Sequence, residues 1–127
     1  MNKVINYISY QSFPAETANS LQTISNLKYL MKNGYYVKLF FPLREKNSSD
    51  DLKTIQNYYL LNQNISIYGV KHPYPFGKIK YFNKLLFHIS HYLWAKSTVK
   101  KFNDDKYKND YFLTRSDWIL LFLAKKN

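Results

Sequence analysis

The sequence contains no cysteine, and this absence excludes two kinds of site. Neither a disulfide bond nor a metal site built on thiolates can form within the chain. His88 and His91 have a helical i, i+3 spacing, but no third histidine or acidic residue lies near them in the sequence. His72 stands in a loop, where it is a candidate general base. We therefore expect no metal site and no cofactor, and a reducing cytoplasm is a compatible location.

Glycine is nearly as scarce, with three residues in a chain of 127. Neither the G-x-G-x-x-G pattern nor the Walker A pattern is present. Both patterns need glycine where the backbone approaches a phosphate closely. Their absence argues against a dinucleotide-dependent dehydrogenase and against a P-loop NTPase.

Arginine is rare in an otherwise basic chain. The formal net charge is +11 and the sequence pI is about 9.7, yet Arg44 and Arg115 are the only arginines. A charge of this size favours either an anionic partner or a solvated, lysine-rich surface. Because base reading and bidentate phosphate binding rely on arginine, nucleic acid is the least favoured partner.

Long apolar runs are missing as well. The first residues, MNKVINYISYQSF, are interrupted by Asn6, Ser9 and Gln11, so they lack the apolar core of a signal peptide. No segment reaches the roughly 20 apolar residues that cross a bilayer as a helix. We expect a cytoplasmic protein, and peripheral contact with the inner face of the cytoplasmic membrane stays open.

Short runs rich in β-branched and aromatic residues alternate with longer segments of helical periodicity. Strands are expected at 3–10, 36–41, 65–70 and 110–114, and helices at 19–33, 51–61, 78–102 and 117–126. This alternation predicts an α/β fold over residues 1–127. It would be a single domain with a Rossmann-like open parallel sheet and helices on both faces.

Each predicted helix has an expected boundary and an expected buried stripe. Asn19 should cap the first helix, with Gln22 as its capping-box partner. Ser49 or Asp50 should cap the second helix, and Pro42 should end the strand before it. The residues expected to face the core are Leu21, Ile24, Leu27, Leu30 and Met31 in the first helix, Phe82, Leu85, Leu86, Ile89, Tyr92, Leu93 and Val99 in the third, and Trp118, Leu121, Phe122 and Ala124 in the last.

The loop between the first strand and the first helix holds the candidate binding residues. In an open α/β sheet, ligands bind beyond the carboxyl ends of the strands, often against a helix N-terminus. Ser12, Glu16, Thr17 and Asn19 offer side-chain hydrogen bonds there. Two interpretations stay open: the loop holds an anionic oxygen of a ligand, or Pro14 shapes a turn and Thr17 or Asn19 merely caps the helix.

Two segments resemble the start of family 4-type glycosyltransferases, which have the two-domain GT-B architecture. In SFPAETANSLQTISNLKYLMKNGYYVKLFFP, the helix-to-strand pattern of the family is matched by Asn19, Gln22, Leu30, Gly34, Tyr35, Val37 and Pro42. DYFLTRSDWILLFLAKK is similar to the fourth-strand region, where TRS closes a strand. Residues 47–109 match only in the alternation of elements. Where many members have a Gly-Gly pair in the first loop, this chain has Ala15-Glu16.

The resemblance implies the acceptor-side domain of a GT-B enzyme, an incomplete N-terminal half without the donor-binding C-terminal domain. Such an enzyme transfers a sugar from a nucleotide-sugar donor to a saccharide or lipid-linked acceptor, and a separately encoded C-terminal half is one conceivable partner. The resemblance implies substrate-binding roles for Ser12, Glu16, Thr17, Asn19 and Arg115. It assigns no catalytic residue, and this chain alone is expected to be inactive.

A non-catalytic alternative starts from the basic and aromatic character of residues 78–101. Its lysines are Lys78, Lys80, Lys84, Lys96, Lys100 and Lys101, interleaved with Tyr81, Tyr92 and Trp94. A small basic α/β binding module of this kind would dock on an anionic membrane surface, a partner subunit or a nucleic acid. A plain solvated helix explains the same residues.

Overall fold

The computed structural model describes residues 3–11, 13–43, 48–61, 65–71 and 83–126. Four strands form one sheet: β1 (Val4–Ile8), β2 (Tyr36–Leu43), β3 (Ile65–Lys71) and β4 (Tyr111–Thr114). Their order across the sheet is β3-β2-β1-β4, and every neighbouring pair is parallel. The predicted parallel α/β sheet is confirmed.

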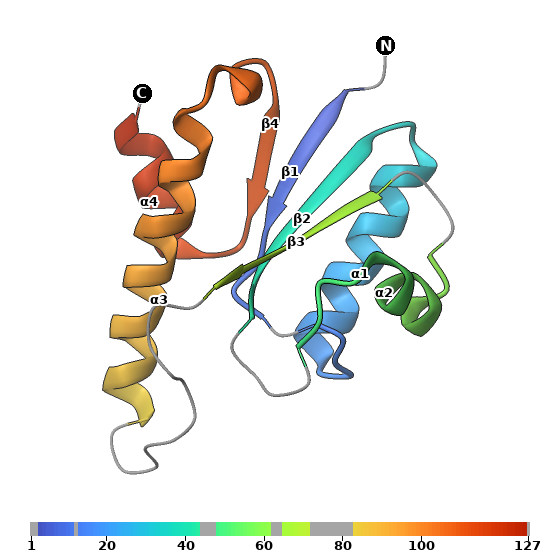
Figure 1. Cartoon of the computed structure of the whole chain (residues 1–127), viewed down its shortest axis with the longest axis horizontal. Helices are drawn as coiled ribbons and strands as arrows, with labels where there is room; N and C mark the ends of the chain where they lie inside the picture. The colour runs from blue at the N-terminus through green and yellow to red at the C-terminus, as the bar shows by residue number, and fades with distance from the viewer. Residues whose placement is uncertain (1–2, 12, 44–47, 62–64, 72–82, 127) are drawn as a thin grey trace.

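Helices cover both faces of this sheet, as Figure 1 shows. The helices α1 (Ala18–Lys32) and α2 (Leu52–Tyr59) pack on one face, and α3 (Asn83–Lys100) and α4 (Asp117–Lys126) pack on the other. Two short 3₁₀ turns, η1 (Lys101–Asn103) and η2 (Asp105–Tyr107), lead from α3 to β4. Because the chain changes face after β3, the sheet is doubly wound around β1.

Alternation along the two central strands fills both layers of the core. On β2, Val37 and Leu39 belong to the cluster under α1 and α2, whereas Phe40 belongs to the cluster under α3 and α4. On β1, Tyr7 and Ile8 divide between the two clusters in the same way. A parallel strand buried on both faces needs apolar residues at successive positions, which explains the near-continuous apolar run of β2.

The boundary of α1 differs from the prediction. Thr17, not Asn19, is the N-cap, because its Oγ1 accepts the Ser20 backbone N–H at 3.2 Å. Asn19 therefore lies inside the helix. Leu21, predicted to face the core, is 46% exposed. The buried positions of α1 are Ser20, Thr23, Ile24, Leu27 and Met31.

Two further boundaries were predicted wrongly. Asp51, rather than Ser49 or Asp50, caps α2, and its Oδ2 accepts the Thr54 backbone N–H at 3.0 Å. Pro42 lies within β2 instead of ending it. β1 pairs with β2 only as far as Phe40. Beyond that residue β2 has one neighbouring strand, so a missing N–H is tolerated as on a sheet edge.

The buried face of α3 also differs from the predicted stripe. Leu85 and Ile89 are exposed, whereas Trp94 is fully buried and its Nε1–H donates to the Val70 carbonyl at 3.3 Å. The predicted burial of Val99 is confirmed. Phe82 and the side chain of Leu86 lie outside the described part. Among the side chains of α3 that the structure describes, the buried ones are Ser90, Trp94, Ala95, Thr98 and Val99.

The buried face of α4 also differs from the predicted one. Ile119 is completely buried, while the predicted core residues Leu121 and Ala124 are exposed. Trp118 and Phe122 are half-buried and pack against Tyr92 of α3. Among the helices in the described ranges, none is long and apolar enough to cross a membrane.

Candidate functional site

A hollow lies at the carboxyl ends of β1 and β4, which is the topological switch point of this sheet. The helices that follow the neighbouring strands β1 and β4, α1 and α4, lie on opposite faces, so the two connections diverge there and leave a crevice. The hollow has a volume of about 390 Å³. Its lining is Tyr7, Ile8, Ser9, Tyr10, Gln11, Ala15, Thr17, Asn19, Ser20, Thr23, Phe87, His91, Arg115 and Ser116.

One wall is the first turn of α1, which carries a row of hydroxyl groups. The Thr17 hydroxyl donates to Ser20 Oγ at 2.9 Å. The Thr23 hydroxyl donates to the Asn19 carbonyl at 3.0 Å, and the same Thr23 Oγ1 lies 3.4 Å from Gln11 Oε1. A hydroxyl that donates to the protein keeps its oxygen as an acceptor. This wall therefore offers fixed acceptors to a ligand.

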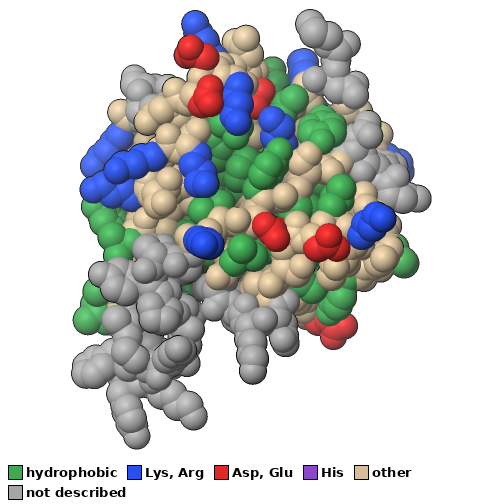
Figure 2. Space-filling model, viewed as in Figure 1, with side chains coloured by type: hydrophobic (Ala, Val, Ile, Leu, Met, Phe, Trp, Pro, Cys, Tyr) green, Lys and Arg blue, Asp and Glu red, His purple; other side chains and the backbone are tan. Residues whose placement is uncertain are grey.

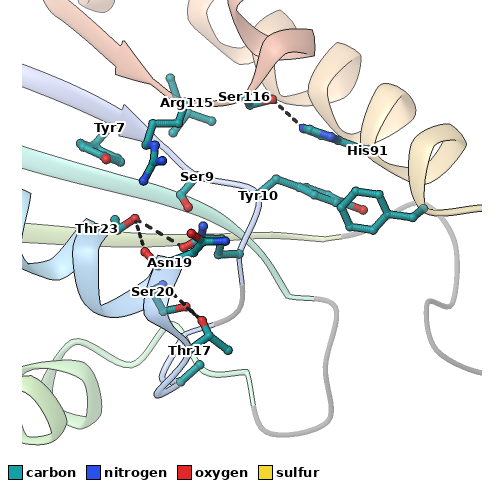
Figure 3. Close-up of a pocket in the computed structure, with 14 residues that line it drawn as sticks. Tyr7, Ser9, Tyr10, Thr17, Asn19, Ser20, Thr23, His91, Arg115 and Ser116 are labelled. Atoms are coloured by element: carbon teal, nitrogen blue, oxygen red, sulfur yellow. Dashed lines mark hydrogen bonds between the residues drawn. The ribbon is translucent and has the colours of Figure 1, made fainter. Parts of the chain in front are cut away.

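The opposite wall is the turn from β4 into α4. Thr114 Oγ1 donates to the Ile8 carbonyl at 2.8 Å and accepts the Ser116 backbone N–H at 3.0 Å. Arg115 Nη1 donates to Gln22 Oε1 of α1 at 2.7 Å, so the two walls are bridged above the hollow. Figure 3 shows Arg115 reaching from the end of β4 toward Ser9.

The third wall comes from α3. His91 Nε2 lies 2.6 Å from Ser116 Oγ. The imidazole stacks on the Tyr10 ring, with centroids 4.1 Å apart and an interplanar angle of 9°. Phe87 meets the same imidazole edge to face at 6.0 Å. Aromatic side chains thus fix the His91 ring while one of its nitrogens faces Ser116 (Figure 3).

The loop before α1 is held from the side of α2. Phe13 is fully buried against Phe41 and Tyr59. The Tyr59 hydroxyl donates to the Ala15 carbonyl and accepts the Ala15 N–H, each at 2.6 Å. Burial raises the pKa of Tyr59, so this phenol stays neutral as both bonds require. The buried Phe13 ring and the Tyr59 hydroxyl therefore both attach the loop to the body of the domain.

Three of the five predicted binding residues come together at the hollow. Thr17, Asn19 and Arg115 line it. Glu16 does not: its carboxylate lies beside Tyr58 of α2, where burial and then this carboxylate raise the pKa of the Tyr58 hydroxyl. The remaining residue, Ser12, lies outside the described residues, as does the candidate base His72.

Sequence reasoning missed Phe87 and His91 of α3 and Ser116 of the turn before α4 as lining residues. His91 was noted only for its spacing from His88, and Ser116 only as the end of the TRS motif. The two are 25 positions apart, so no local pattern links them. His88 is exposed and does not line the hollow.

Charge in and around the hollow is unevenly distributed. Of the described residues that line it, Arg115 alone carries a permanent charge, and none is a carboxylate. Within the described ranges, no group of three or more histidine or acidic side chains could hold a metal ion. The hollow is therefore suited to a ligand that is rich in hydroxyl groups and is either neutral or carries one anionic group.

Within the described part of the basic segment, the expected aromatic residues are not on the surface beside the lysines, whereas Lys78, Lys80 and Tyr81 lie outside the described residues. Trp94 is buried in the core, and Tyr92 packs against Trp118. Lys96 and Lys100 remain exposed.

No protein-family model, curated protein or solved structure matches this chain.

Proposed function

We propose that the hollow binds a saccharide, and that the chain is the acceptor-side domain of a nucleotide-sugar-dependent glycosyltransferase. One observation carries the proposal: hydroxyl and amide groups line a hollow at the switch point of a doubly wound sheet. Ligands of such sheets bind at this place. The volume of about 390 Å³ lies within the range of about 300–1,000 Å³ for small-molecule sites.

The lining matches the chemistry of a sugar. Saccharide hydroxyls both donate and accept, so they pair with serine, threonine, asparagine and glutamine side chains. Thr17, Thr23, Asn19 and Gln11 supply such groups. The apolar C–H face of a sugar ring needs an apolar surface, and the Phe87 ring supplies one on the wall formed by α3.

The transfer step needs groups that this chain contributes only in part. The acceptor hydroxyl oxygen forms a bond to the anomeric carbon of the donor sugar, the bond from that carbon to the diphosphate breaks, and the hydroxyl proton is released. Arg115, hydrogen-bonded to a neutral glutamine, can also face the diphosphate and stabilise its developing charge. A C-terminal half would hold the nucleotide, and the reaction would take place in the cytoplasm, at a membrane surface if the acceptor is lipid-linked.

A binding experiment tests the saccharide site. Saturation-transfer NMR with neutral mono- and disaccharides should give signals for the wild-type chain. The Asn19→Ala variant should weaken them several-fold, because a lining amide is lost. Asn57→Ala is the matched control, since Asn57 is also exposed on a helix but lies on α2, away from the hollow. Equal signals for both variants, or none for the wild type, would exclude a saccharide site here.

The transferase part of the proposal has a separate test. Nucleotide-sugar turnover is measured for this chain alone and after addition of a GT-B C-terminal half. We expect no turnover by the chain alone and transfer by the pair. If saccharides bind but no pair ever binds or turns over a nucleotide sugar, the transferase assignment fails while the saccharide site stands.

A second candidate function is a basic module that docks on an anionic membrane surface, a partner subunit or a nucleic acid. The observation in its favour is the net charge of +11, with Lys96 and Lys100 exposed on α3. Figure 2 shows basic side chains most crowded at the left of the view, with only a few acidic ones on this face. Cosedimentation with vesicles containing phosphatidylserine should be salt-sensitive. It should fall in Lys96→Glu/Lys100→Glu, but less in the α1 control Lys28→Glu/Lys32→Glu.

A further inference from the structure

Ser116 is held between two partners that constrain where its proton can go. Ser116 is buried, with 7% of the residue exposed, and its Oγ accepts the Ile119 backbone N–H at 3.3 Å. A hydroxyl has one proton to donate and can accept through two lone pairs. Its second close partner, His91 Nε2 at 2.6 Å, therefore decides how the hydroxyl behaves toward a ligand in the hollow.

The imidazole cannot easily turn to offer a different atom. It is stacked on Tyr10 and packs against Phe87, so tilting the ring would break both contacts, and flipping it within its plane would put carbon in place of Nε2 beside Ser116. A change in the protonation of His91 must then change the direction of its hydrogen bond with Ser116, that is, which of the two residues donates. Histidine is the side chain whose ordinary titration, near pH 6.5, falls within the range where proteins work.

We propose that His91 and Ser116 are ligand-recognition residues, and that the charge of His91 selects between a neutral and an anionic ligand oxygen. When His91 is neutral, Nε2 accepts the Ser116 proton, so Ser116 Oγ offers a ligand only an acceptor and favours a sugar hydroxyl. When His91 is protonated, Nε2–H donates to Ser116 Oγ, and the serine proton points to the ligand. Ser116 then favours a carboxylate or phosphate oxygen.

The surroundings of the pair strengthen this selectivity. The lining has no carboxylate, and Arg115 is next to Ser116 in the chain. A protonated His91 would add a second positive charge to the hollow, and a partly buried charge is screened weakly. Other titratable groups on the lining or next to it in the chain include the phenols Tyr7 and Tyr10, Glu16 of the loop, His88 and Tyr92 of α3, and Asp117 at the start of α4.

The inference rests on the proposed saccharide site and names the chemistry that the site distinguishes. The probes are glucose and glucuronate, which differ only in a hydroxymethyl or a carboxylate group. Their dissociation constants are measured for the full chain at pH 8.0 and pH 5.5, a range in which exposed carboxylates normally stay ionised. For the wild type, the preference for glucuronate over glucose should rise about tenfold at the lower pH. This is the gain when a neutral hydrogen bond becomes charge-assisted.

Matched histidine variants identify the responsible group. His91→Gln should remove the pH dependence, because glutamine does not titrate. His88→Gln, three residues earlier on the same helix but exposed and outside the hollow, should keep it. The proposal is overturned if the preference of the wild type is the same at both pH values. It is also overturned if His91→Gln keeps the pH dependence.

A measurement without ligand separates this inference from the proposed function. The ring ¹⁵N shifts of His91 report which nitrogen carries the proton in the neutral form. Nε2 without a proton at pH 8.0, gaining one on acidification, supports the reversal of the hydrogen bond between His91 and Ser116, whether or not either probe binds. If neutral His91 carries its proton on Nε2, the pair cannot change polarity and the inference fails, even if saccharides bind.

Discussion

Replacing Tyr59 by phenylalanine tests how the loop beside the hollow is held in place. The substitution keeps the buried ring and removes the hydroxyl that bonds both the N–H and the carbonyl of Ala15. A typical hydrogen bond contributes a net 0.5–1.5 kcal/mol, so the loss of two should lower the free energy of unfolding by about 1–3 kcal/mol. The effect should also reach the hollow, because Ala15 is part of its lining.

Urea unfolding followed by tryptophan fluorescence measures this change. With a urea dependence of about 2 kcal/mol per M, the unfolding midpoint of Tyr59→Phe should fall by roughly 0.5–1.5 M without a change in slope. Tyr58→Phe is the matched control. Its ring is 45% exposed and its hydroxyl faces Glu16 at the surface, so its stability should change by less than about 0.5 kcal/mol.

The same pair of proteins has an expected pH dependence. Burial raises the pKa of folded Tyr59 above its ordinary value of 10.0. Its contribution to stability is therefore fully present below pH 10 and is lost as the pH rises through the folded pKa. The stability difference between wild type and Tyr59→Phe should shrink above pH 10. Equal midpoints for the two phenylalanine variants at pH 7 would refute the bonding described for Ala15.

Three other substitutions test local features. Thr17→Ala removes the cap of α1 and should cost about 0.5–2 kcal/mol by chemical unfolding, whereas no loss would mean that Asn19 caps the helix after all. Trp94→Ala should cost about 3–5 kcal/mol because the side chain is fully buried, and a surface-like cost below 1 kcal/mol would contradict its place in the core. Hydrogen bonds from the hydroxyl and the backbone N–H of Thr54 lower the pKa of Asp51, so its stabilisation of α2 is present above pH 3.8 and is lost as the pH falls through the folded value. Asp51→Asn should make acid unfolding, followed by circular dichroism, less steep; an unchanged acid profile would rule out this contribution.

The order of elements was predictable because it depends on local patterns. Apolar runs bounded by turn residues marked the four strands, and the Asn33-Gly34 pair marked the end of α1, where Gly34 has a φ of +90°. That helices cover the sheet follows from the alternation of strands and helices, since each connection between parallel strands must cross a face of the sheet, whereas the face that each helix covers depends on the strand order.

The buried faces of the helices were less predictable because packing, not period, decides them. Helix α3 packs on the sheet and also against α4, so apolar residues occur around most of its circumference. Leu85 fits the helical period as well as Trp94 does, yet only Trp94 meets the sheet, at Val70. In α1, polar Ser20 and Thr23 are buried at the hollow, a position that favours hydroxyls over the apolar stripe.

The sequence predicted the part of the candidate site that lies in the loop after the first strand, but it did not predict the part formed by α3 and the turn before α4. Ligands of open α/β sheets bind where the first strand ends, which pointed to Thr17 and Asn19. The other half needed the strand order, because β4 lies beside β1 although more than 100 residues separate them. Only that pairing brings Ser116 and His91 to the same place as α1.

The hydroxyl of Thr114 connects the wall of the hollow to the pairing of β1 with β4, so the sheet sets the width of the hollow at its base. It joins the Ile8 carbonyl to the Ser116 amide, and Ile8 and Thr114 are themselves partners in the β1–β4 ladder. The spacing of adjacent strands, about 4.8 Å, therefore fixes how far apart the two walls begin. Substitutions at Gln11 or Ala15, which line the hollow, would change its side wall and leave the spacing of β1 and β4 unchanged. A lineage carrying this fold could thus exchange one ligand for another by altering a single loop, with no need to redesign its core.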